Sequence, residues 1–87
     1  MYLGLGKGKF IDEKNIIGIF DLDITSQSHI TRKYLNMAEK EGKIINAAED
    51  IPKSFVIENN GSTYLSQMNT ATLIKRAEEE SINGRNQ

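Results

Sequence analysis

The residues best suited to catalysis in this chain are two carboxylates, Asp21 and Asp23, which follow an apolar run at residues 16–20. Paired carboxylates after a strand are typical of nucleophilic and acid/base chemistry. His29 is the single histidine and the chain has no cysteine, so the usual nitrogen and sulfur ligands of a transition metal are missing. We therefore interpret His29 as an exposed residue in the first turn of a helix, and we expect no metal and no cofactor.

The segment from Asp21 to Thr25, DLDIT, resembles the nucleophile motif of haloacid-dehalogenase-type phosphatases. In those enzymes the first aspartate attacks phosphorus, the second acts as acid/base and Mg²⁺ offsets the charge. They need a parallel sheet and a distant lysine and aspartate pair, which a chain of 87 residues does not supply. We therefore expect the two acids to end a strand and enter a loop, and we do not expect an enzyme.

Glycines at alternate positions, Gly4, Gly6 and Gly8, follow the apolar start of the chain. Their spacing is close to that of a dinucleotide-binding loop, but the GxGxxG pattern fails and no parallel βαβ unit follows. The pattern favours a hairpin whose glycine-rich tip carries Lys7 and Lys9. We expect no small-molecule substrate.

Length and charge bound the possible functions. We expect one domain over residues 1–82 and a disordered tail over residues 83–87. The formal net charge of −1 does not by itself indicate a nucleic-acid partner. No apolar run approaches the roughly 20 residues of a membrane span and no signal peptide is visible, so we expect a cytoplasmic protein without a membrane partner.

The positioning elements are organised around a hairpin between Pro52 and Ser66. Asn60-Gly61 is the strongest short-range signal for a type I′ turn, because both turn residues need positive φ. A two-residue turn at Asn60-Gly61 would place Ile57 opposite Tyr64 and Val56 opposite Leu65.

This register makes both faces of the hairpin partly apolar. One face carries Phe55, Ile57 and Tyr64, and the other carries Val56 and Leu65. Only two helices are available as cover, and an exposed apolar patch of more than a few hundred Å² is unusual for a monomer. We therefore expect these five residues to form the interface of a homo-oligomer, with a cyclic head-to-tail contact.

The remaining segments complete an α+β fold with a mostly antiparallel sheet, in the order ββ(β)-α-ββ-α. Residues 16–20 predict a strand buried on both sides, with a bulge at Gly18. Residues 43–45 predict a short strand. The first helix is expected to begin at Thr25, Ser26 or Ser28 and to end at about Glu41, with Gly42 after its end. Its apolar stripe consists of Ile30, Tyr34, Met37 and Ala38. The second helix is expected from Asn69 onward.

Several stretches in this order resemble the bacterial extracellular matrix regulatory protein family, the RemA/RemB group, and more closely its RemB-type branch. The resemblance covers residues 1 to about 78, and no single piece of it is specific. Its residues are Met1-Tyr2, Leu5-Gly6, Ile17 to Asp21, Pro52 to Ser54, Val56-Ile57, Tyr64, Ser66 and Thr72 to Ala77.

The resemblance implies a small α+β protomer that assembles into rings and regulates transcription by binding DNA. In the RemA branch such proteins activate biofilm-matrix and osmoprotection genes, and arginines around the ring hold the DNA backbone. Lys53 falls at one of these basic positions, whereas Asp50, Ile51 and Asn15 stand where that branch carries arginines.

Our main hypothesis is therefore an oligomeric DNA-binding transcriptional regulator that contacts the backbone of double-stranded DNA. Repeated lysines on one rim would release counterions from many phosphates together. The candidate DNA-binding residues are Lys53, Lys14, Lys7 and Lys9. The alternative is an oligomeric protein-interaction module without nucleic-acid binding, which the missing arginines favour.

Overall fold

The α+β class is confirmed by a computed structural model, which describes residues 2–25 and 28–85. Within these ranges, two successive stretches of the sequence each consist of three strands followed by a long helix. The elements are β1 (Tyr2–Gly6), β2 (Lys9–Asp12), the 3-10 helix η1 (Glu13–Asn15), β3 (Ile16–Asp21), α1 (Leu22–Thr25), α2 (His29–Lys40), β4 (Ile44–Asn46), β5 (Ser54–Glu58), β6 (Thr63–Ser66) and α3 (Thr70–Arg85).

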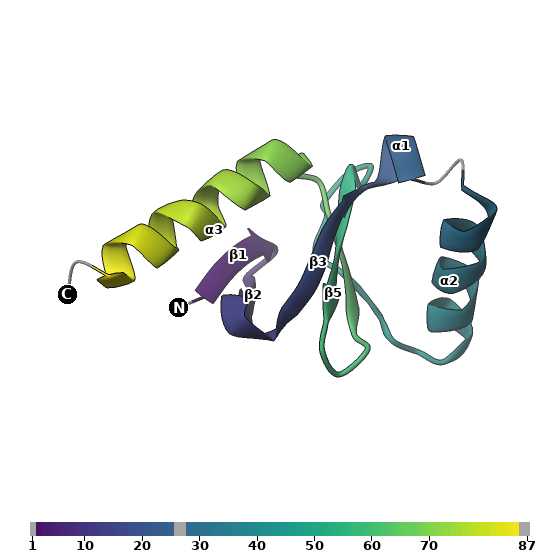
Figure 1. Cartoon of the computed structure of the whole chain (residues 1–87). Helices are drawn as coiled ribbons and strands as arrows, with labels where there is room; N and C mark the ends of the chain where they lie inside the picture. The colour runs from purple at the N-terminus through teal and green to yellow at the C-terminus, as the bar shows by residue number, and fades with distance from the viewer. Residues whose placement is uncertain (1, 26–27, 86–87) are drawn as a thin grey trace.

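A four-stranded sheet with the order β3-β5-β6-β4 forms the middle of the molecule. The β1–β2 hairpin and α3 lie on one side of this sheet, and α2 lies on the other (Figure 1). Neighbouring strands are antiparallel except β4 and β6, which are parallel. These layers follow one another along the long axis of the molecule, which measures 42 × 23 × 23 Å along its principal axes.

The predicted glycine-rich hairpin tip is confirmed between β1 and β2. Lys7 and Gly8 form the turn, and both have positive φ, 51° and 70°. Gly6 also has positive φ, and a Cβ atom there would collide with the backbone oxygen of Ala47. The hairpin tip therefore lies against the segment that follows β4.

The register predicted for the central hairpin is wrong by one residue. Its loop has three residues, 59–61, because Glu58 N donates to Ser62 O (2.9 Å) and Gly61 N donates to Glu58 O (2.9 Å). Gly61 has positive φ but Asn60 does not, so the type I′ turn does not form. The cross-strand pairs are Ser54 with Ser66, Phe55 with Leu65, Val56 with Tyr64 and Ile57 with Thr63.

The strand β3 is not buried on both sides, contrary to the prediction from its apolar sequence. It lies at the edge of the sheet, and none of its six residues is fully buried. A continuous apolar run does not distinguish a central strand from an edge strand. The bulge is confirmed, because the register of β3 against β5 shifts between Ile16 and Gly18.

The core lies between the sheet and the layer made of β1, β2 and α3. Its fully buried residues come from segments far apart in the sequence, and Ile19, Tyr64 and Met68 pack against it. The central cluster consists of Leu3, Leu5, Ile11, Ala47, Val56 and Leu73.

Two buried serine hydroxyls on the sheet bind this layer and the segment that leads into α3. Ser66 Oγ donates to the backbone oxygen of Leu5 (2.8 Å) and accepts from the backbone N–H of Met68 (3.2 Å). Ser54 Oγ, on the neighbouring strand, donates to Met68 O (2.7 Å). Both serines are fully buried, so these bonds satisfy groups that water cannot reach.

The helix α2 forms where the sequence predicts it. Ser28 is its N-cap, and Gly42 follows its end with a φ of 71°. The predicted apolar stripe is partly wrong, because Ile30 and Met37 are 78% and 53% exposed. The side facing the sheet carries Ala38, which is buried, with Thr31, Tyr34 and Leu35 half-buried.

The helix α3 begins after Asn69, whose Oδ1 accepts from the backbone N–H of Thr72 (2.8 Å), as predicted for a cap. The helix extends to Arg85, past the residue where we expect the tail to begin, and residues 86–87 of that tail lie outside the described residues. None of the helices in the described ranges is long and apolar enough to cross a membrane.

Replacing Ser66 by alanine should lower the free energy of unfolding by about 1–3 kcal/mol, because Leu5 O and Met68 N lose a buried hydrogen-bond partner. Urea denaturation followed by circular dichroism measures this loss. Ser62→Ala, in the loop between β5 and β6, is the control and should change stability by less than about 0.5 kcal/mol. Equal effects of the two variants would contradict the role of the Ser66 hydroxyl.

Candidate nucleic-acid interface

Lys53 directly precedes β5, and hydrogen bonds hold its backbone on both sides. Its N–H donates to Ser66 O (2.8 Å), and its oxygen accepts from the N–H of Leu22, the first residue of α1 (2.9 Å). The side chain is exposed. The charged side chain of Lys53 is therefore held at one end of the four-stranded sheet.

Lys7 and Lys9 lie near the same end of the sheet. Gly6 approaches Ala47 closely, and Ala47 N donates to Leu65 O (2.8 Å), one residue before the Ser66 oxygen that binds Lys53. Both lysine side chains are exposed. Three of the four candidate DNA-binding lysines thus adjoin the end of β6.

Lys14 lies at the opposite end of the sheet. It belongs to η1, and the neighbouring Asn15 accepts through its backbone oxygen from Asn59 N, in the loop after β5 (2.8 Å). The length of β5, about 17 Å for five residues, separates this end from Lys53. Lys14 Nζ also lies 3.7 Å from Asp12 Oδ2, so its charge is partly compensated.

Acidic residues share the end of the sheet that carries Lys53. The loop before Pro52 is fixed by Gln67, whose Oε1 accepts from the backbone N–H groups of Glu49 (2.8 Å) and Asp50 (3.2 Å). Glu49 and Asp50 are exposed, and Ile51 is 77% exposed. The surface around Lys53 is therefore mixed in charge.

The five residues that we expect at an oligomer interface differ in accessibility. Phe55 and Val56 are buried within one copy, whereas Ile57, Tyr64 and Leu65 are half-buried. Burial raises the pKa of the Tyr64 phenol, and the Glu58 carboxylate raises it further through its charge and through the hydrogen bond that it accepts (3.5 Å). The phenol therefore loses its proton less readily than that of an exposed tyrosine.

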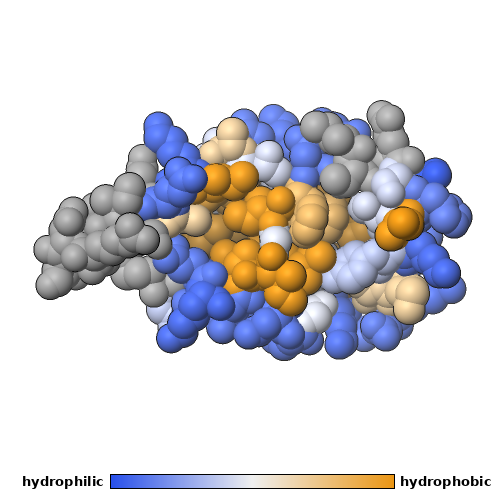
Figure 2. Space-filling model, in the orientation of Figure 1, coloured by the Kyte–Doolittle hydropathy of each residue, from blue (hydrophilic) through white to orange (hydrophobic). Residues whose placement is uncertain are grey.

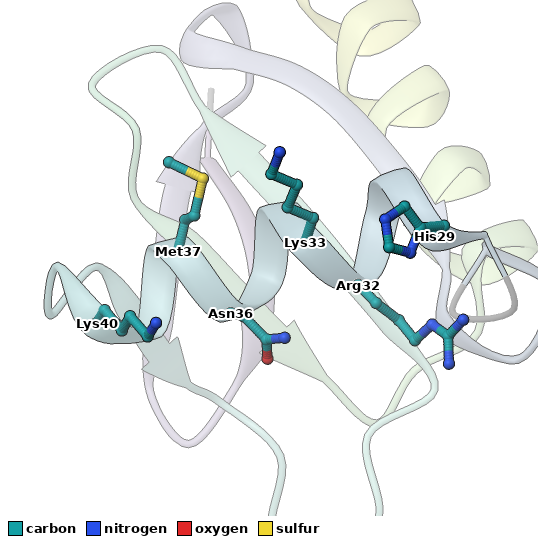
Figure 3. Close-up of a pocket in the computed structure, with 6 residues that line it drawn as sticks. All are labelled: His29, Arg32, Lys33, Asn36, Met37 and Lys40. Atoms are coloured by element: carbon teal, nitrogen blue, oxygen red, sulfur yellow. The ribbon is translucent and has the colours of Figure 1, made fainter.

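A denser group of cations lies on the side of α2 that faces away from the sheet. Six exposed side chains surround a shallow hollow there, and we call them the α2 outer surface (Figure 3). Lys33 and Met37 leave the helix on one side in this view, and Arg32 and Asn36 leave it on the other. The α2 outer surface consists of His29, Arg32, Lys33, Asn36, Met37 and Lys40.

Sequence reasoning interprets Arg32 and Lys33 only as solvent-exposed residues and does not connect them with the rest of this surface. The connecting signal is their spacing, since residues 29, 33, 36 and 40 follow one another at intervals of four, three and four. Such positions share one face of a helix. His29 lies in the first turn and is exposed, as predicted.

The two carboxylates singled out for catalysis lie at the end of β3 and in α1. The strand before them pairs antiparallel with β5, whereas the phosphatase motif that they resemble requires a parallel sheet. Among the described residues, no group of three or more His, Cys, Asp or Glu side chains is arranged to hold a metal ion.

The structure is a small α+β domain whose exposed cations lie at the two ends of the sheet and on α2. Comparison with known proteins assigns the domain to a family. A family model described as "RemA-like: Extracellular matrix regulatory protein A-like" matches residues 2–77, which include all six strands. The chain therefore belongs to the RemA-like family of extracellular matrix regulatory proteins, and the resemblance found in the sequence is confirmed.

A curated relative extends the comparison. The chain is 31% identical over 78 residues to a protein named Extracellular matrix regulatory protein B, from Bacillus subtilis (strain 168). The aligned region covers 90% of this chain and 91% of the relative. The similarity therefore spans both sides of the sheet and α2.

The attachment of α2 to the sheet depends on a hydrogen bond between Tyr34 Oη and Thr63 Oγ1, which are 2.7 Å apart. Tyr34→Phe and Thr63→Val should be coupled by about 0.5–1.5 kcal/mol in a double-mutant cycle measured by urea denaturation. Tyr2→Phe is the matched control, because Tyr2 is exposed and should not couple to Thr63. Additive effects of Tyr34→Phe and Thr63→Val would contradict this attachment.

Proposed function

We propose that this protein is an oligomeric, DNA-binding regulator of transcription that acts on genes of the extracellular matrix of biofilms. The observation that carries the proposal is membership of the RemA-like family over residues 2–77. The relative with 31% identity has a name that describes regulation of the extracellular matrix.

The exposed lysines support binding to the phosphate backbone. Lys53 has an anchored backbone and an exposed side chain, and Lys7 and Lys9 lie near the same end of the sheet. One copy with a net charge of −1 offers few such contacts. Several copies in a ring repeat them, and each neutralised phosphate releases counterions. Binding of this kind falls steeply with added salt.

The edge strand β3 supports assembly. Its outer edge pairs with no other strand in the described part of the chain, and Ile17 is 66% exposed. Phe20 stacks on Phe55 (ring centroids 5.0 Å apart) and remains half-buried. Hydrophobic surface gathers over the region of β3 in Figure 2. An apolar edge strand is a template for a second copy, which would cover both its side chains and its backbone groups.

A second function, a protein-interaction module without nucleic acid, is favoured by the charges near Lys53 and Lys14. Asp50 and Glu49 are exposed at the end of the sheet that carries Lys53, and Asp12 pairs with Lys14. These acids oppose the approach of phosphates. Retention of duplex DNA at near-physiological salt would exclude this function.

Lys53→Glu should weaken binding of duplex DNA by about tenfold or more, because every copy loses one phosphate contact and gains a repulsive charge. A gel-shift titration measures this effect, and mass measurement in solution should show an unchanged assembly. Lys75→Glu, on the exposed surface of α3, makes the same charge change and is the control. Equal retention of DNA by both variants would exclude the role of Lys53.

Ile17→Asp should shift the protein towards the mass of a single chain, because a carboxylate in a contact between apolar edges loses its hydration. Light scattering after size-exclusion chromatography measures the mass. Ile51→Asp is the matched control, since Ile51 is also largely exposed but lies in the loop before β5. An unchanged mass of the Ile17 variant would rule out β3 as the contact.

A further inference from the structure

We infer that the α2 outer surface is a second contact for the phosphate backbone of duplex DNA, separate from Lys53 and the lysines of the β1–β2 hairpin. The inference rests on the proposed DNA-binding function and adds a binding surface that neither the family membership nor the sequence assigns.

The charge of this surface is of one sign. Arg32, Lys33 and Lys40 contribute three cations, and Asn36 adds an amide donor between them. No acidic side chain among the described residues lines the hollow. Within the described residues none of the three cations forms an ion pair, in contrast to Lys14 with Asp12. Glu39 belongs to α2 but is not among the residues around the hollow.

The arrangement of these groups suits an extended anion. His29 and Lys40 are eleven positions apart, which corresponds to about 16 Å along the helix axis. All six side chains are exposed and come from a single helix, so they do not converge on one enclosed point. Duplex DNA carries one negative charge per about 1.7 Å of its axis and can engage all of them together. The planar Arg32 guanidinium is suited to paired phosphate oxygens.

Two other partners with negative charge fit this surface less well. Ile30 and Met37 are exposed on the same helix, as they would be in a helix that lies in a membrane surface. However, the opposite side of α2 is fixed to the sheet through buried Ala38 and the Tyr34–Thr63 hydrogen bond, so a continuous apolar face is not available to lipid. An acidic protein would use Ile30 and Met37 as anchors, and their substitution separates this case from DNA.

The place of α2 in the fold allows both surfaces to act on one duplex. Lys53 binds the first residue of α1 through its backbone, and α2 follows α1 after three residues. In Figure 1, α1 and the first turn of α2 lie towards the same end of the molecule. The first turn of the α2 outer surface therefore lies towards the end of the molecule that carries Lys53.

The test is a titration of the full chain with fluorescently labelled duplex DNA, followed by anisotropy at several salt concentrations. The double variant Arg32→Ala/Lys33→Ala should bind at least tenfold more weakly at 0.15 M salt, because two phosphate contacts are lost per copy. The slope of log K against log salt should decrease by about 1.8 for each copy whose α2 touches DNA. Alanine is the best helix former, so α2 itself is preserved.

The matched control is Lys75→Ala/Arg76→Ala, an adjacent and exposed basic pair on α3, which should leave the affinity within twofold of the parent protein and the slope unchanged. If the parent binds DNA and the α2 variant binds equally well, the inference is wrong and the proposed function stands. If the parent binds no DNA, the proposed function fails, and the inference with it. A larger loss with Ile30→Ala/Met37→Ala than with Arg32→Ala/Lys33→Ala, or binding of the parent to anionic vesicles but not to DNA, would also overturn the inference.

Discussion

The Ser66 hydroxyl is the point at which the separate parts of this fold are joined. It lies on the sheet, donates to the first strand and accepts from the segment that leads into the last helix. In a buried position such a hydrogen bond contributes modestly by itself, but an unsatisfied partner is costly. The geometry of the hairpin β1–β2, the start of α3 and the end of β6 is therefore linked, and these are the elements that place Lys7, Lys9 and Lys53 near one another.

The two sides of the sheet are covered unequally. The side that carries Val56 is closed by β1, β2 and α3, which form the core with it. The other side is covered by α2, which contacts β4 and is bonded to Thr63 on β6, and the edge at β3 keeps half-buried and exposed apolar residues. A contact between copies at β3 would leave the outer side of α2 accessible, so assembly and binding of a polyanion can use different surfaces.

Sequence reasoning predicts the element order, the caps Ser28 and Asn69 and the bulge at Gly18, since each depends on local backbone requirements. It fails where a choice depends on neighbours in space. Asn60-Gly61 is compatible with two loop lengths, and the longer one shifts the register by one residue. This register pairs Val56 with Tyr64, and both side chains pack in or against the core. Similarly, the apolar sequence of β3 does not reveal that the strand lies at an edge. The α2 outer surface could have been found from its spacing, because that signal is local.

The fully buried Leu73 in α3 packs into the same cluster as Leu3 and Leu5, and the hydrogen bond from Ser66 to Leu5 connects positions 61 residues apart. Contacts between such distant positions slow folding, because a long loop must close before they form. The β1–β2 hairpin is synthesised before the residues that cover its apolar side, which are Ala47, Val56 and Leu73. The hairpin therefore keeps an open hydrophobic surface until these later segments have been made and have folded against it.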